Sequence, residues 1–352
     1  MAVSRVCYCS REDVQRSPDF KDSAGFAGRI DRAIQSVSDI IEDHLHRTFY
    51  PADTTYKFDW PGGYSAPWRL WLNQWDLLAL TQVQSPQGTT IPLASVIPRP
   101  VNRKPGRPYR YIELDRSASA FFNAGSTPQL AIWVTGTWGF CNDTDAAGTL
   151  TAAVSSAGAT SIAVSDASKM GVGNLLVIGT ERLLVTGRTF ADTSVSFGGV
   201  QTADDSDQIV SVPDATLFAI GEELRIDSER LLITDIMGNF LIVTRGWNGS
   251  LLGAHTGGTI YAARSLTVAR GQYGSTAATH LQNDAVTRHR VPPGIRDLAI
   301  AESINRVLQE TGGYSRTTGE ADAQQSAPGD GLAGLWDEAM TSYGRKARSR
   351  AV

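Results

Sequence analysis

The chain has 352 residues, of which 41% are hydrophobic and 19% charged, and its formal net charge is −4. This composition can bury a core, which excludes wholesale disorder, and the length exceeds that of a single core, so two domains are expected. The slight acidity excludes a generally basic nucleic-acid-binding protein, although local basic patches remain possible. No apolar run approaches the ~20 residues that span a bilayer, and residues 1–10 lack the apolar segment of a signal peptide, so we expect a soluble protein made in a cytoplasm, without membrane contact.

Apolar residues recur at helical spacing in the segment 22–48, which predicts an amphipathic helix. Ser23 is the expected N-cap, and Pro51 prevents continuation of the helix. The apolar positions of this helix are Ile30, Ile34, Val37, Ile41 and Leu45. Strands are then expected over residues 54–58, 68–72, 77–84, 110–114 and 129–134.

Half of the eight tryptophans cluster at Trp60, Trp68, Trp71 and Trp75. An exposed row of this kind can stack on sugar rings, but the surrounding leucines favour a core or a subunit interface, where tryptophan is enriched. A basic stretch interspersed with prolines follows, which predicts an extended arm. It is either simply solvated, or it contacts DNA phosphates, an acidic partner surface or a neighbouring chain. Its basic residues are Arg99, Arg103, Lys104, Arg107 and Arg110.

The middle of the chain repeats itself. Residues 178–186 (IGTERLLVT) align with 226–234 (IDSERLLIT), and 243–250 (VTRGWNGS) with His255 is echoed by 268–275 (VARGQYGS) with His280. Short apolar runs separated by glycine turns predict small antiparallel barrels or sandwiches. The expected copies cover about 160–210 and 211–262, with a partial third at 263–290. We expect Glu181 and Glu229 to pair locally within Glu-Arg turns, and His255 and His280 to bond to the backbone.

A second helix is predicted to begin at the Pro-Pro-Gly of residues 292–294 and to end at the Thr-Gly-Gly of 311–313. Residues 314–331 are rich in small and polar residues and read as a flexible linker. A short apolar stripe and a basic cluster follow, which is the form of a docking peptide. The stripe is Leu332, Leu335, Trp336 and Met340, and the cluster is Arg345, Lys346, Arg348 and Arg350.

The predicted fold class is therefore α+β. A small helical and β core (1–140 and 291–313) is interrupted by an inserted all-β domain (141–290) and followed by a linker and tail (314–352). Nucleotide-binding, metalloprotease, hydrolase and dinucleotide-binding motifs are missing from the sequence, so no enzymatic activity is expected. Cys7, Cys9 and Cys141 form no C-x-x-C pair and no zinc-spaced set, so we expect no disulfide framework, no metal and no cofactor.

The flanks of this chain resemble head-to-tail adaptor (connector, head-completion) proteins of long-tailed bacteriophages. The matching stretches are residues 30–34, 40–50, 58–61, 70–72, 134–140 and 291–299. In the family, the Trp-Gly strand runs almost directly into the Val-Pro start of the last helix. Here ~150 residues intervene, the size of a domain. The resemblance covers about the first 140 and last sixty residues and leaves the repeats unexplained.

The resemblance implies a virion protein that forms a dodecameric ring beneath the portal, at the neck between head and tail. The ring extends the channel through which genomic DNA passes without sequence specificity, and it presents a platform to the stopper or tail-terminator protein. We expect the first helix, with Trp71 and Trp75, to form the subunit interface. The tail from Leu332 to Arg350 is expected to bind the portal and to be disordered in the monomer. The insert, with fifteen acidic and ten basic residues, is expected to project outward, decorating the neck or meeting the capsid.

Two other functions remain open at this point. The first is a different neck component, such as a stopper or tail-completion protein, which differs in stoichiometry and partner. The second is a polysaccharide-binding or polysaccharide-degrading tail protein with the tryptophans as platform. A degrading protein needs paired carboxylates across a cleft, and a glycan pull-down tests either version.

Overall fold

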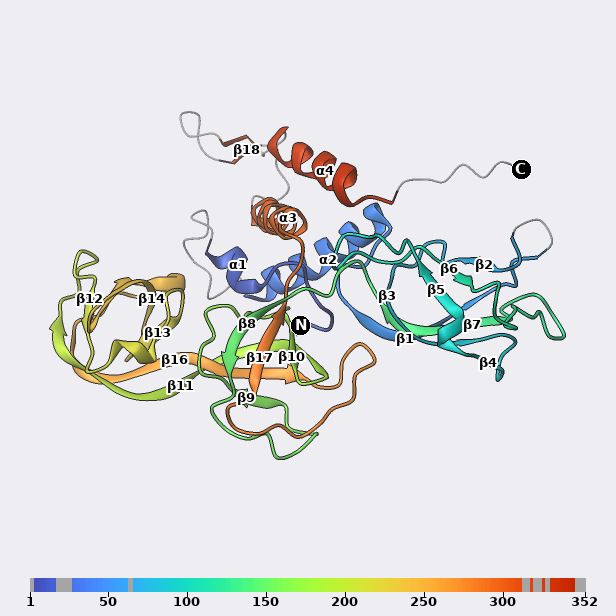
Figure 1. The fold of residues 1–352 in the computed structure, drawn as a ribbon. Helices are drawn as coiled ribbons and strands as arrows, with labels where there is room; N and C mark the ends of the chain where they lie inside the picture. Colours follow the sequence, from blue (N-terminus) through green and yellow to red (C-terminus); the bar gives the residue numbers. More distant parts are fainter. Residues whose placement is uncertain are drawn as a thin grey trace.

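The computed structural model describes residues 3–16, 27–62, 66–311, 317–318, 325–326 and 330–345. The protein belongs to the α+β class, and its helices lie between two β regions at opposite ends of an elongated molecule (Figure 1). The helices are α1 (Arg11–Gln15), α2 (Ala27–Leu45), α3 (Pro293–Thr311) and α4 (Asp330–Tyr343), and three short 3-10 turns lie at η1 (Leu93–Ser95), η2 (Ala215–Leu217) and η3 (Trp247–Gly249).

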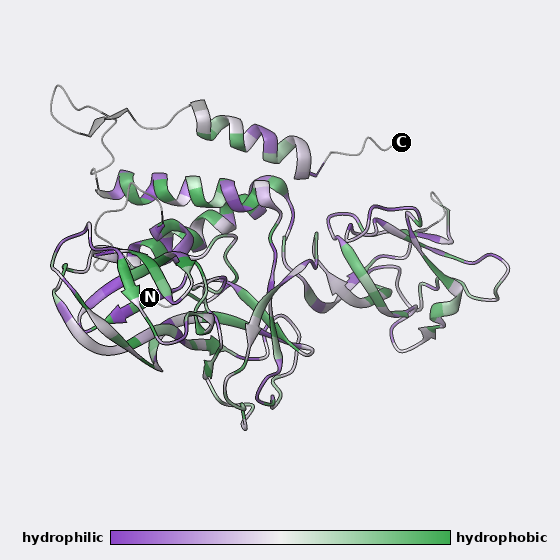
Figure 2. Ribbon diagram, turned by 60° about the vertical axis from the view of Figure 1, so that its left-hand side comes forward, coloured by the Kyte–Doolittle hydropathy of each residue, from purple (hydrophilic) through white to green (hydrophobic). Residues whose placement is uncertain are grey.

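The two predicted helices pack against each other although they come from opposite ends of the chain. Both α2 and α3 carry hydrophobic and hydrophilic residues, as Figure 2 shows for the helical layer. Pro293 stands at the first position of α3, where its missing N–H costs no helical hydrogen bond. Ser23, the expected N-cap of the first helix, lies outside the described residues.

The apolar face of α2 is covered by the chain itself. Its five predicted apolar side chains are all 0% exposed. They share one core with Ile295 and Leu298 of α3 and with the nearer part of the second β region. The expectation that this face forms the subunit interface is therefore wrong. The apolar spacing correctly predicts a buried face, but other elements of the same chain bury it, not a neighbouring subunit. The five residues are Ile30, Ile34, Val37, Ile41 and Leu45.

This assignment predicts the effect of truncating one of these side chains. Ile34→Ala should lower the free energy of unfolding by about 2–5 kcal/mol, because it leaves a cavity in a packed core. Ile40→Ala, the same change at a partly exposed position of α2, should cost clearly less. Urea denaturation of the dilute chain measures both. Equal, small effects would mean that Ile34 is not a core residue of the isolated chain.

The first β region contains two small sheets around a core of its own. One has the strand order β1-β7-β3-β4 and the other β2-β6-β5. The expected strand at 129–134 begins later, because Leu130 has φ +53° and cannot continue an extended strand. The strands are β1 (Ala52–Phe58), β2 (Arg69–Trp71), β3 (Leu77–Gln84), β4 (Thr90–Ile91), β5 (Val96–Arg99), β6 (Tyr111–Leu114) and β7 (Ile132–Trp138).

The second β region is a ten-stranded antiparallel sheet with the path β12-β15-β14-β13-β16-β11-β10-β17-β8, and β9 pairs with β16. The long strands β11 and β16 form a ribbon that joins a near part, next to the helices, to a far part at the end of the molecule (Figure 1). The strands are β8 (Thr144–Thr149), β9 (Ser161–Ala163), β10 (Leu175–Ile178), β11 (Glu181–Gln201), β12 (Ile209–Ser211), β13 (Glu223–Ile226), β14 (Glu229–Met237), β15 (Phe240–Thr244), β16 (His255–Ala269) and β17 (Ala285–His289); two short strands, β18 (Thr317–Thr318) and β19 (Gln325–Ser326), pair separately.

The buried residues do not separate at the expected domain boundary near residue 141. Leu150, Ile162 and Leu176 of the near part belong to the same core as Ile34 and Leu298 of the helices. The far part has its own core, which includes residues of β13, β14 and β15. The near part is thus not an independent domain attached to the helices, because it covers their apolar faces.

A buried glutamate organises each part of this sheet. In the far part, Glu229 accepts two hydrogen bonds from Arg245, both of 2.7 Å, and lies 2.9 Å from His255 Nε2. The backbone N–H groups of Gly246 and Gly253 also donate to it, at 2.9 and 3.0 Å. Five contacts therefore satisfy one carboxylate that is 0% exposed.

The near part contains the same arrangement around Glu181. Arg270 donates to this carboxylate at 2.6 and 2.7 Å, and His280 Nε2 lies at 2.7 Å. The backbone N–H groups of Gly271 and Ala278 complete the set, at 3.1 and 3.0 Å. The expectation that both histidines bond to the backbone is wrong, because each contacts the glutamate. Residues 263–290 also form no third unit: they supply the partners of the first copy, and the far part lies between its two halves.

Candidate functional site

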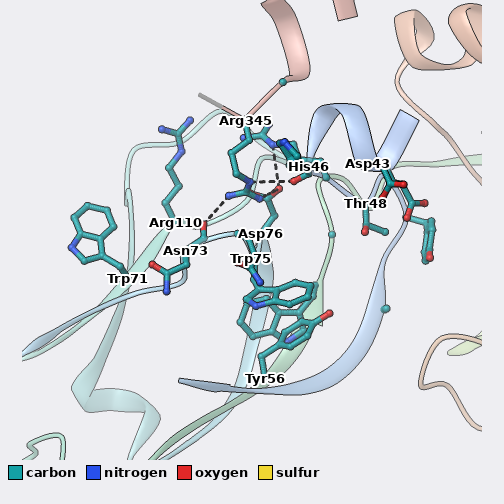
Figure 3. A pocket seen from close by; sticks show the side chains of 18 of the residues that line it. Asp43, His46, Thr48, Tyr56, Trp71, Asn73, Trp75, Asp76, Arg110 and Arg345 are labelled. Atoms are coloured by element: carbon teal, nitrogen blue, oxygen red, sulfur yellow. Dashed lines mark hydrogen bonds and ion pairs between the residues drawn. The ribbon is translucent and has the colours of Figure 1, made fainter. Parts of the chain in front are cut away.

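A groove of about 1600 Å³ opens between the C-terminal end of α2, the first β region and the end of α4. Figure 3 shows its polar wall, where Arg345 of the α4 end reaches down to Asp76 and Asn73. With Arg47, which follows α2 and lies 3.4 Å from Asp76, the wall combines three distant stretches of the chain. Asp76 and Arg47 belong to no motif in the sequence, and the adjoining Trp75 is the nearest signal for the site.

Arginines outnumber acids around Asp76. Its carboxylate lies 2.8 Å from Arg345 and 3.4 Å from Arg47. The guanidinium of Arg110 also lines the groove, and it makes no hydrogen bond or ion pair with the described part of the chain. Burial lowers the pKa of Arg47, and the charges of Arg345, Arg110 and Arg107 lower it further, against the opposing effect of Asp76. This wall therefore favours a negatively charged partner.

The facing wall is aromatic. Tyr56 stacks on Trp75 with ring centroids 3.8 Å apart, and Trp138 meets the edge of Tyr56 at 4.8 Å. Trp71 also lines the groove and packs on Tyr111 at 4.4 Å. Arginine and aromatic side chains are the residues most enriched where proteins bind each other. The groove thus offers both charge and apolar surface to one ligand.

The tryptophan cluster does not form an exposed row. Trp60, Trp68 and Trp75 are partly buried against the core of the first β region. The indole of Trp60 donates to the carbonyl of Phe122 at 3.0 Å, and Arg116 stacks on Trp68. Because these rings point into packed surroundings, they offer no continuous platform for sugar rings.

The predicted basic arm is folded against the first β region. Arg99 lies in β5 and binds Glu113 at 2.9 Å. Arg103 stacks on Tyr109, and Arg107 stacks on Phe140. Lys104 and Arg110 are exposed. The expectation of an extended arm is therefore wrong for most of this stretch, because three of its four arginines have aromatic or acidic partners within the chain.

The predicted docking tail packs on the chain's own helices over residues 330–345. Leu332, Leu335 and Trp336 are partly buried against the core that contains α2 and α3. The Trp336 ring lies 5.1 Å from that of His44, whereas Met340 is 40% exposed. The expectation of a tail disordered in the monomer is wrong for this part, because α4 has an apolar stripe that the α2 and α3 surface covers. Lys346, Arg348 and Arg350, and most of the predicted linker, lie outside the described residues.

The two repeat glutamates and the cysteines are buried. Glu181 and Glu229 are enclosed by their arginine and histidine partners and face no cleft. Burial raises the pKa of the Cys7 thiol to about 12 and that of Cys9 well above its usual value. Within the parts of the chain that the structure describes, no group of three or more His, Cys, Asp or Glu side chains could hold a metal ion, and no helix has the length and apolarity to cross a membrane.

Comparisons with protein-family models, with curated proteins and with solved structures found no match.

Proposed function

We propose that the protein is a structural component of a phage neck, a head-to-tail adaptor that assembles as a dodecameric ring beneath the portal. In this role the ring extends the DNA channel and presents a platform to the stopper or tail-terminator protein. Its fold is then an adaptor core of helices and the first β region, interrupted by an all-β insert built from two small barrel-like repeats. The proposal rests on the resemblance of the flanks and on how these flanks meet.

The observation that carries the proposal is the closeness of the two ends of the insert. Thr144 of β8 pairs with His289 of β17, and the N–H of Arg290 donates to the carbonyl of Asp143 at 2.8 Å. The chain therefore leaves the Trp-Gly strand and returns to the start of α3 at nearly the same point. Insertions are tolerated where both junctions lie side by side at the surface of the host fold.

The packing of the flanks supports the same function. α2 and α3 contact each other, and the carbonyl of Phe49, just after α2, lies 2.8 Å from His289 Nε2 and 3.5 Å from Cys141 Sγ at the junction. A chain without the insert could run from β7 directly into α3 and keep the contact between these two helices, although it would lose His289 and the near part that covers their apolar faces. A stopper or tail-completion protein remains the nearest alternative, and only its partner and stoichiometry distinguish it.

The test is the mass of the purified particle, measured by native mass spectrometry with and without portal protein. We expect a closed ring of twelve chains that binds the portal. A variant that ends at Arg345 keeps α4 packed on the core but lacks the basic tail, and it should assemble while losing portal affinity. Removing residues 332–352 is a poorer test, because it also uncovers α2 and α3. A chain that stays a monomer alone and with portal contradicts the proposal.

A further inference from the structure

The far end of the second β region carries a tip built from two adjacent loops. Gln201 pairs with His255 at the end of the β11–β16 ribbon, so residues 202–207 and 251–253 lie beyond the last pair (Figure 1). The buried Arg245 joins the two loops. Its guanidinium donates to the carbonyls of Thr202 and Asp207, both at 3.1 Å, and to that of Gly253 at 2.7 Å. The tip is therefore a rigid feature held by a buried cation.

The surface of this tip is both acidic and apolar. Asp204 and Asp205 are exposed, as are Leu251 (86%) in the tip and Val200 (70%) at the adjoining end of β11. The far part as a whole, residues 190–262, contains ten acidic and three basic residues. Exposed leucine and valine next to carboxylates indicate a surface for a partner that offers both cations and apolar area.

The groove has the complementary chemistry. The wall around Asp76 has three arginines, Arg47, Arg110 and Arg345, against this one acid, whereas Glu42 and Asp43 line the groove at α2. The guanidinium of Arg110 has no ion-pair partner among the described residues, and Tyr56, Trp71 and Trp75 supply apolar surface. DNA would satisfy the arginine, but it leaves the exposed apolar side chains of the tip unexplained. A second chain satisfies both surfaces at once.

We propose that the acidic tip of one chain docks in the arginine-lined groove of a second copy of the same chain. Tip and groove lie in opposite β regions of the elongated molecule (Figure 1), so one chain cannot join its own two surfaces. The contact is heterologous, because different patches meet, and it closes into a ring when the rotation between neighbours allows. That the contact forms a ring rests on the proposed function. In that ring the insert bridges neighbouring subunits.

Two charge reversals test this contact, and their mixture provides the rescue. Asp205→Arg reverses the tip and Arg110→Glu reverses the groove; neither side chain is an ion-pair partner of the described residues. Each variant alone should self-associate at least ten-fold more weakly in sedimentation velocity runs at low salt. An equimolar mixture should regain association, because each reversed tip now faces a reversed groove. Asp235→Arg and Lys104→Glu make the same charge changes away from the tip and the groove, and they should associate as wild type does.

The outcomes separate this inference from the proposed function. If both variants form rings as well as the wild-type chain does, the proposed contact is overturned and the adaptor function still stands. Weakening by Arg110→Glu alone, without an effect of Asp205→Arg, shows that the groove takes another anionic partner and also overturns the contact. If both variants self-associate weakly and their mixture associates no better, the proposed contact is also overturned. A wild-type chain that stays a monomer with and without portal protein overturns both proposals.

Discussion

Glu229→Gln is expected to lower the free energy of unfolding of the far part by about 3–5 kcal/mol, because it removes the charge that compensates a fully buried arginine. Arg245 has an exposed side-chain fraction of 0%, and Glu229 is the acid that binds its guanidinium. The arginine also holds the loops 202–207 and 251–253 together through their carbonyls. Loss of the carboxylate therefore loosens the tip as well as the core beneath it.

Hydrogen exchange across the urea transition measures this effect locally. In Glu229→Gln, residues 229–245 of the far part should lose protection from hydrogen exchange. In Glu181→Gln, residues 181–186 of the near part should lose it, because each glutamate binds partners in its own part. Glu310→Gln is the matched control, because Glu310 binds the exposed Arg32 and should change the free energy of unfolding by about 1 kcal/mol at most. Equal losses for Glu310→Gln and Glu229→Gln would refute the special role of the buried pair.

The same contacts predict how stability depends on pH. Hydrogen bonds from arginine, histidine and backbone outweigh desolvation and lower the pKa values of Glu181 and Glu229 from 4.5 to about 2. Because the folded-state pKa lies below the unfolded one, this stabilisation is complete above about pH 4.5 and is lost as the pH falls towards 2. Thermal unfolding between pH 6 and 2 should show a steeper decline for wild type than for the double Gln variant.

Gly139→Ala is expected to cost at least about 3 kcal/mol, which combines a strained backbone with a steric clash. Gly139 has φ +141°, and an added Cβ would lie 2.2 Å from the carbonyl oxygen of Tyr50. Its N–H donates to the carbonyl of Asp76 at 2.8 Å. Displacing this residue would therefore shift the chain that follows α2 and one wall of the groove.

Gly179→Ala separates the two contributions. Gly179 has φ +59°, but nothing lies within 4 Å of an added Cβ, so this change should cost only about 1–2 kcal/mol. Denaturation curves of both variants, recorded together, give the difference that belongs to the clash. A Gly139→Ala variant as stable as Gly179→Ala would show that the chain around Tyr50 relaxes freely.

Docking of α4 on the helices changes how the tail can act. Arg345 anchors the end of α4 to Asp76 at 2.8 Å and to the carbonyl of Asn73 at 2.9 Å. Any partner that takes α4 away from the core must replace these contacts and cover the apolar surface that it leaves. The residues beyond Arg345 are therefore better placed to reach a portal than the apolar stripe is.

Local patterns in the sequence were sufficient to predict α2, α3 and the hairpins of the Glu-Arg turns, whereas the short α1 was not predicted. The spacing of Ile30, Ile34 and Val37 indicates a helix with one buried face, and Pro293 can occupy the first position of a helix but not its interior. The repeated Glu-Arg turns were recognised as equivalent, and their glutamates proved to have the same sets of contacts. These features depend on interactions between residues that are close in the sequence, so the sequence pattern alone predicts them.

The partners of these features were decided by tertiary structure. Glu181 binds Arg270 and His280, which follow it by 89 and 99 residues, and the intervening far part hides this relation from a linear comparison. Periodicity likewise shows that α2 buries one face, but not whether its own chain or a neighbour covers it. Asp76, Arg47 and Arg345 meet only after three segments have packed. Contacts between distant segments depend on which surfaces come together, and no local pattern encodes that choice.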